Sequence, residues 1–122
     1  MRTLNLDLLS DFLSERKDIA FAVVFGSAAD GNPRAGSDLD LGIFFTEKPG
    51  SEELIDLLTE VADLLDFDRV DYTDLSKADP ILAFEALSGR FLCKNDKVKT
   101  AEFSSLISRL YEDIMVRLNT VA

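Results

Sequence analysis

Two aspartates, Asp38 and Asp40, are separated by one residue and follow a loop that contains glycine, serine and proline. Side chains alternate between the two faces of a strand, so both carboxylates should share one face while Leu39 and Leu41 enter the core. Two carboxylates beside an apolar core repel each other, and a cation that lies between them offsets this repulsion. Mg²⁺ prefers oxygen ligands, with substrate phosphates completing its shell, so this spacing predicts a divalent-metal site.

A glycine and a serine, Gly26 and Ser27, follow the apolar run IAFAVVF, and ten residues separate them from Asp38. Glycine lets the backbone approach a phosphate closely, and the N–H groups and the serine hydroxyl can donate to its oxygens. Gly36 and Ser37 are further candidates for nucleotide binding in the same loop. An isolated pair of aspartates with this spacing is also common at the exposed start of an ordinary strand, so that alternative stays open here.

Three other binding motifs do not fit this stretch. A calcium-binding loop that starts at Asp38 would need a glycine in place of Ile43 and an acid in place of Pro49. A P-loop read from Gly31 lacks its lysine, and a dinucleotide-binding fingerprint lacks its third glycine. The chain contains no histidine and one cysteine, Cys93, which excludes Ser-His-Asp catalysis, histidine-ligated zinc and an internal disulfide. The chemistry must therefore rest on carboxylates.

The composition favours a small acidic globular protein. Its 122 residues, 47% of them hydrophobic, suit a single domain that spans 1–122. With 23 acidic against 13 basic residues, the chain should repel nucleic acid, and we expect a basic protein partner or a substrate screened by metal. There is no apolar run long enough for a membrane span and no signal-peptide pattern, and the single cysteine suits a reducing cytoplasm. We therefore expect a cytoplasmic protein.

The hydrophobic patterns place these candidates in an α/β or α+β fold with helices on either side of the strands. We expect helices at 3–16, 51–66, 78–87 and 101–121, strands at 19–25, 38–46, 67–72 and 90–93, and a loop at 26–37. The expected helix caps are Thr3 or Asn5, Ser51 and Asp79. The apolar face of the long C-terminal helix should belong mainly to the core, with part of it left for a partner or a second copy.

The pair Gly26-Ser27, the ten residues that follow and Asp38-Leu39-Asp40 resemble the signature of the polymerase-β-type nucleotidyltransferase superfamily. The segments VDYTDL (70–75), GRFLCKND (89–96) and RLYEDIMVRL (109–118) extend the resemblance to the minimal nucleotidyltransferase (MNT) domains of bacteria. This resemblance implies a nucleotidyltransferase fold with a mixed sheet flanked by helices. It also implies that Asp38 and Asp40 bind Mg²⁺, and that Asp71 on the next strand is the third catalytic and metal-binding carboxylate.

A short MNT domain is similar to the antitoxins that pair with HEPN-domain ribonuclease toxins. The resemblance implies transfer of AMP from ATP to the toxin, at a tyrosine hydroxyl, within a homo-oligomer or a hetero-oligomer with the toxin. Many relatives carry arginines after the Gly-Ser pair, whereas this chain has Ala28-Ala29-Asp30-Gly31 and offers only Arg34. A catalytically weak or inactive antitoxin that acts by binding alone is therefore a second hypothesis. Transfer to a small molecule ranks last, because the relatives that modify antibiotics carry an additional acceptor domain.

Overall fold

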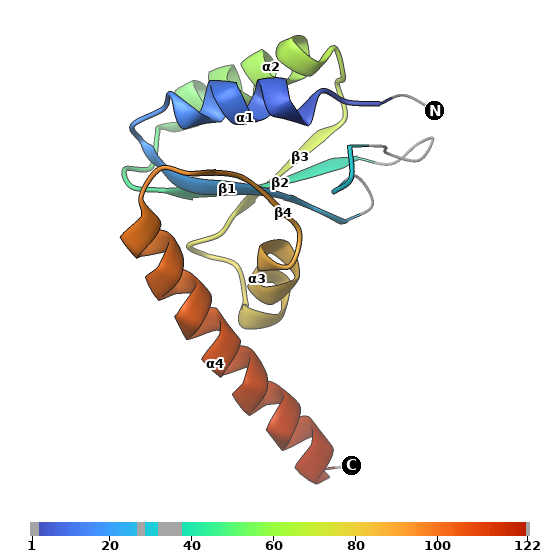
Figure 1. Cartoon of the computed structure of the whole chain (residues 1–122), viewed down its shortest axis with the longest axis vertical. Helices are drawn as coiled ribbons and strands as arrows, with labels where there is room; N and C mark the ends of the chain where they lie inside the picture. Colours follow the sequence, from blue (N-terminus) through green and yellow to red (C-terminus); the bar gives the residue numbers. More distant parts are fainter. Residues whose placement is uncertain (1–2, 27–28, 32–37, 122) are drawn as a thin grey trace.

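The computed structural model describes residues 3–26, 29–31 and 38–121. Four strands form one sheet in the order β3-β2-β1-β4. Strand β1 (Ile19–Phe25) pairs antiparallel with β2 (Leu39–Phe45) and with β4 (Arg90–Lys94), whereas β2 and β3 (Val70–Asp74) run parallel. Helices α1 (Leu6–Ser14) and α2 (Ser51–Leu65) cover one face, and α3 (Pro80–Leu87) and α4 (Lys97–Val121) lie on the other (Figure 1). The predicted mixed sheet flanked by helices is therefore confirmed.

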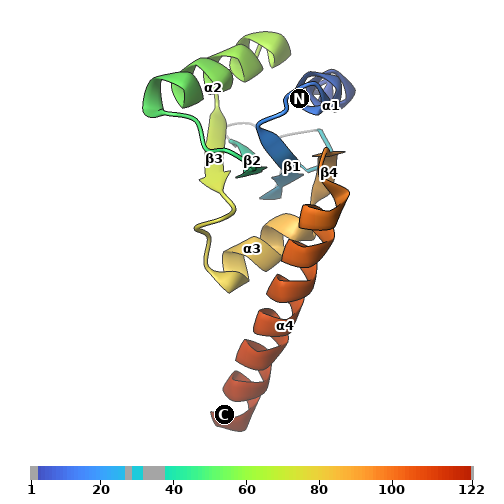
Figure 2. The ribbon, with the colours of Figure 1, turned by 90° about the vertical axis from the view of Figure 1, so that its left-hand side faces the viewer.

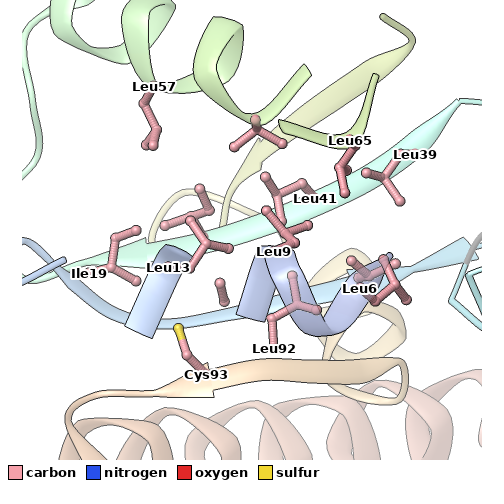
Figure 3. Packing of buried hydrophobic residues seen from close by; sticks show 14 of the residues in the cluster. Leu6, Leu9, Leu13, Ile19, Leu39, Leu41, Leu57, Leu65, Leu92 and Cys93 are labelled. Atoms are coloured by element: carbon pink, nitrogen blue, oxygen red, sulfur yellow. The ribbon is translucent and has the colours of Figure 1, made fainter. Parts of the chain in front are cut away.

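The face beneath α1 and α2 carries the larger apolar core. Every residue of β1 is buried, and the alternate β2 residues Leu39 and Leu41 are fully buried. They pack with Leu9 of α1 and Leu57 of α2 (Figure 3). Because side chains alternate along a strand, the aspartates that flank Leu39 belong to the opposite face of the sheet.

Helices α3 and α4 pack on that opposite face around a group of aromatic rings. The ring centroid of Phe21 in β1 lies 5.3 Å from that of Phe44 in β2 and 5.8 Å from that of Phe103 in α4. The two helices also contact each other, where the rings of Phe84 and Tyr111 stack with their centroids 3.8 Å apart. These contacts hold α3 against the sheet face that carries the aspartates.

The third strand differs from its prediction at 67–72, because β3 runs from Val70 to Asp74. Asp66 has a left-handed backbone conformation (φ 49°) that ends α2, and pairing with β2 begins only at Val70. The parallel pairing continues as far as Asp74, so this residue belongs to the strand and does not lie beyond it as expected. Helix α2 also differs at its start, since Gly50 occupies the cap position expected for Ser51.

The C-terminal helix begins at Lys97, ahead of the predicted start at 101. The side chain of Asp96 accepts a hydrogen bond from the Lys99 N–H at 2.9 Å, as a helix cap does. The expectation that the helix belongs mainly to the core is wrong, because much of α4 extends away from the sheet (Figure 2). Among the residues of α4 whose burial the structure describes, the exposed large apolar ones are Val98, Leu106, Leu110, Val116 and Leu118. Within the described residues no helix is both long and apolar enough for a membrane span.

Candidate active site

The three predicted acidic residues lie at one end of the sheet and on one face of it. Asp38 directly precedes β2, and Asp40 and Asp71 are the second residues of β2 and β3. Asp40 and Asp71 are direct neighbours in the parallel register, so their side chains leave the sheet on the same side. Asp38 lies two residues before Asp40 and shares that side. The structure therefore brings the three carboxylates to one end of the sheet, on the face that also carries α3.

Gly26 lies directly against this group. It follows Phe25, the last residue of β1, which pairs with Asp40. The φ angle of Gly26 is +74°, and a Cβ at this position would collide with Oδ2 of Asp40. The backbone conformation thus favours glycine, and any larger residue would also displace the carboxylate of Asp40. The other predicted nucleotide-binding residues, Ser27, Gly36 and Ser37, lie outside the described residues.

The carboxylates repel one another most strongly at Asp40. Burial raises the pKa of Asp40 above its ordinary value, and negative charges raise it further; they come from Asp71, Asp38 and Glu85. Sequence reasoning missed Glu85, which belongs to α3. No pattern in the helix marks it, because only the packing of α3 on the sheet brings it near Asp40. Negative charge is therefore concentrated around one partly buried carboxylate.

Arg69, the residue just before β3, places a positive charge in the same region. Its Nε donates to Oδ1 of Asp38 at 3.2 Å, and the two side chains are 50% and 52% exposed. Its carbonyl accepts a hydrogen bond from the Leu39 N–H at 2.7 Å, where the pairing of β2 and β3 begins. Sequence reasoning missed this residue as well. A signal was present, because strand alternation puts Arg69 on the same face as Asp71.

The donors at this edge suit a hard divalent cation, since all are carboxylate oxygens and a bound cation would offset the repulsion at Asp40. As the side chains stand, however, no group of three or more His, Cys, Asp or Glu residues could hold a metal ion in the described part of the chain. Asp38 is engaged with Arg69 instead. A site for Mg²⁺ on all three aspartates would therefore require the carboxylates to move closer together.

Asp30, the acidic residue of the loop, lies near the start of α1. It lines a pocket together with Asp7 and Arg90, and the neighbouring Gly31 carbonyl accepts from the Leu4 N–H at 2.7 Å. The charges that raise the pKa of Asp40 come from other residues. The described part of the loop therefore directs this acid toward α1.

One known protein family matches most of this chain. The family described as "Polymerase beta, Nucleotidyltransferase" matches residues 8–98, a segment that contains Gly26 and all three aspartates. A search of curated protein sequences gave no significant match.

Solved structures share the fold across nearly the whole chain. A toxin-antitoxin structure with AMP-PNP is similar with a TM-score of 0.72 and 20% identity, over 97% of this chain and 95% of the other. A toxin-antitoxin MntA-HpeT variant, in which two aspartates one residue apart are each replaced by glutamate, has the same TM-score of 0.72, 20% identity and coverage of 97% and 95%. A Shewanella oneidensis complex of tri-AMPylated HEPN toxin with MNT antitoxin has a TM-score of 0.65 and 17% identity, over 95% and 92% of the two chains.

The family match covers most of the chain, and the solved structures share its arrangement of sheet and helices. This chain therefore belongs to the polymerase beta nucleotidyltransferase family.

Proposed function

We propose that this protein is the antitoxin of a HEPN toxin and MNT antitoxin pair, and that it transfers AMP from ATP to a tyrosine hydroxyl of the toxin. The observation that carries the proposal is the meeting of Gly26, Asp40 and Asp71 at one sheet edge in a member of a nucleotidyltransferase family. Two similar structures support it. One contains AMP-PNP, and the other joins an MNT antitoxin to a tri-AMPylated HEPN toxin.

In this proposal Asp38, Asp40 and Asp71 hold Mg²⁺, and the loop residues Gly26, Ser27, Gly36 and Ser37 hold the triphosphate of ATP. The metal would neutralise charge that develops on the phosphate oxygens. The toxin hydroxyl oxygen attacks the α-phosphorus, and the bond from this phosphorus to the pyrophosphate oxygen breaks. Asp71 accepts the hydroxyl proton, and pyrophosphate leaves. The exposure of Asp71 supports this role, because an acceptor from another protein must reach it.

The charge of the whole chain supports a protein acceptor. A formal net charge of −10 favours encounter with a basic partner and disfavours nucleic acid. In the proposal the toxin itself supplies the surface that positions the acceptor hydroxyl.

The test is the intact mass of the protein encoded beside this one, after co-expression with wild-type chain or with Asp38→Asn. We expect the partner to gain adenylyl units with the wild type and none with the variant. Asp63→Asn is the matched control, because Asp63 is an exposed aspartate on α2, across the sheet from the site. This control should leave the mass gain intact.

One observation favours a second function, in which the antitoxin is catalytically weak or inactive and neutralises the toxin by binding alone. Asp38 is paired with Arg69, and the described residues hold no group ready for a metal ion. This function predicts an unmodified partner that co-purifies equally with wild type and with Asp38→Asn. That result would exclude AMP transfer.

A further inference from the structure

The ion pair between Arg69 and Asp38 places a positive charge where the proposed cation would bind. The guanidinium Nε donates to Oδ1 of Asp38 at 3.2 Å. An oxygen engaged in this way is less available to a metal, and the guanidinium charge also opposes a cation beside the same carboxylate. In the metal-free chain the guanidinium partly balances the charge of Asp38.

The backbone of Arg69 is anchored, whereas its side chain reaches into solvent. The Leu39 N–H donates to the Arg69 carbonyl at 2.7 Å, and the next residue, Val70, begins the pairing of β3 with β2. The side chain itself is 50% exposed. The guanidinium therefore lies at a solvent-accessible position at the end of the sheet.

A guanidinium suits two partners at this site. Its planar N–H donors match the oxygens of a carboxylate and those of a phosphate. The sequence of the loop at 26–37 contains a single basic residue, Arg34. A cation anchored beside β3 would supply a second phosphate partner from a different element.

We propose that Arg69 is a positioning residue that holds Asp38 in the nucleotide-free chain and turns to the triphosphate of ATP when Asp38 joins the metal site. This inference rests on the proposed function, because it takes Asp38 as a metal ligand. Arg69 thereby couples the two binding events. Its pairing with Asp38 lowers the affinity for the metal alone, and its pairing with phosphate raises the affinity for the metal and nucleotide together.

The test compares Arg69→Gln with wild type in two binding measurements that need no toxin. Mn²⁺ alone is titrated by electron paramagnetic resonance, and AMP-PNP is titrated by calorimetry at saturating Mn²⁺. The variant should bind Mn²⁺ about two- to fivefold more tightly, since a competing ion pair of this exposure is weak. It should bind AMP-PNP about tenfold more weakly, since a charge-assisted hydrogen bond to phosphate is lost.

Two further variants separate this role from a general structural effect. Arg69→Lys keeps the charge and loses the planar donors. Its affinities for Mn²⁺ and for AMP-PNP should therefore be intermediate between those of wild type and Arg69→Gln. Arg16→Gln breaks a comparable ion pair, with Asp18 at 3.0 Å, at the opposite end of β1. This control should leave both affinities unchanged.

Unchanged affinities in Arg69→Gln would overturn the proposal, as would a loss of affinity for both probes. A wild-type chain that does not bind Mn²⁺ would overturn it as well. The outcome is distinct from that of AMP transfer, because both shifts can occur while the partner protein stays unmodified. That combination would retain the role of Arg69 and reject the transfer reaction.

Discussion

Gly26 sets how closely the backbone approaches the carboxylate of Asp40. Its φ of +74° is unfavourable for other residues, and a Cβ would displace Oδ2 of Asp40. Gly26→Ala should therefore slow the proposed AMP transfer about 100-fold, because small displacements of reacting groups have large effects on rate. It should also lower the free energy of unfolding by about 1–2 kcal/mol. The rate of toxin modification and urea unfolding measure the two effects.

Gly50→Ala is the matched control for this glycine. Gly50 has a φ of −66°, and a Cβ there would meet only the side chain of Glu53 at 3.8 Å. Transfer by this variant should equal that of wild type. A Gly26→Ala chain as active as the control would show that the site does not depend on close approach of the backbone.

The raised pKa of Asp40 leads to a prediction on stability in the absence of metal. Burial and the neighbouring carboxylates disfavour the charged form in the folded chain, so its ionisation destabilises the fold at neutral pH. This penalty disappears as the pH falls through the raised pKa toward the ordinary value of 3.8. Asp40→Asn should therefore melt at a higher temperature than wild type at about pH 7, and the difference should shrink near about pH 4. Circular dichroism melts in EDTA test this.

Asp74→Asn should show the opposite sign. Burial alone would raise the pKa of Asp74, but hydrogen bonds from Lys48 and Ser76 hold it below its ordinary value. Its charge therefore stabilises the fold above the ordinary pKa, and this contribution is lost as the pH falls through the lowered one. The variant should melt below wild type at about pH 7. A melting temperature below that of wild type in both variants would contradict the assignment of repulsion to Asp40, and one above it in both would contradict the stabilising role of Asp74.

At the scale of elements, α3 brings Glu85 toward the site, and its first turn depends on one cap. The Asp79 carboxylate accepts from the Leu82 N–H at 2.9 Å, with Pro80 as the first helical residue. Asp79→Ala should lower the free energy of unfolding, measured in urea, by about 1 kcal/mol. Asp79→Ser should lower it much less, because a serine hydroxyl can also cap the helix. Equal stability of the two variants would show that the cap contributes nothing.

Elements that begin with a strong local signal are those that the sequence predicts best. Asp79 and Pro80 fix the start of α3 through their own side chains, and the structure agrees with the prediction at this point. The limits of β3 depend on pairing with β2, which its own residues do not encode, and the predicted strand was shifted. Helix α4 began before its prediction because its cap, Asp96, precedes the apolar spacing that starts at Phe103.

The residues of the site also divide into those placed by local sequence signals and those placed by packing. The shared face of Asp38 and Asp40 was predictable, because strand alternation and the motif spacing both act along the sequence, whereas the place of Asp71 was implied by the family resemblance. The approach of Glu85 was not, because it follows from the packing of α3. Neither was the pairing of Arg69 with Asp38, which depends on side-chain conformations. The roles of Ser27, Gly36 and Ser37 stay predictions.

At the scale of the whole molecule, α4 is the feature that extends farthest from the sheet (Figure 1, Figure 2). Its first part is packed, with Ile107 buried and Tyr111 stacked on Phe84 of α3. Near its end, Val116 and Leu118 are 63% and 57% exposed. The end of the helix therefore adds little to the packing of the body.

A chain that ends at Met115 should retain the stability of the full chain to within about 0.5 kcal/mol in urea, because the side chains of residues 116–120 are exposed. Ile107→Ala is the contrasting variant, since it removes a buried side chain and should cost about 2–5 kcal/mol. A truncated chain destabilised as much as Ile107→Ala would show that the end of α4 packs on the body. The aspartates lie at the end of the sheet formed by the starts of β2 and β3, so the truncated chain should also bind Mn²⁺ and AMP-PNP as the full chain does.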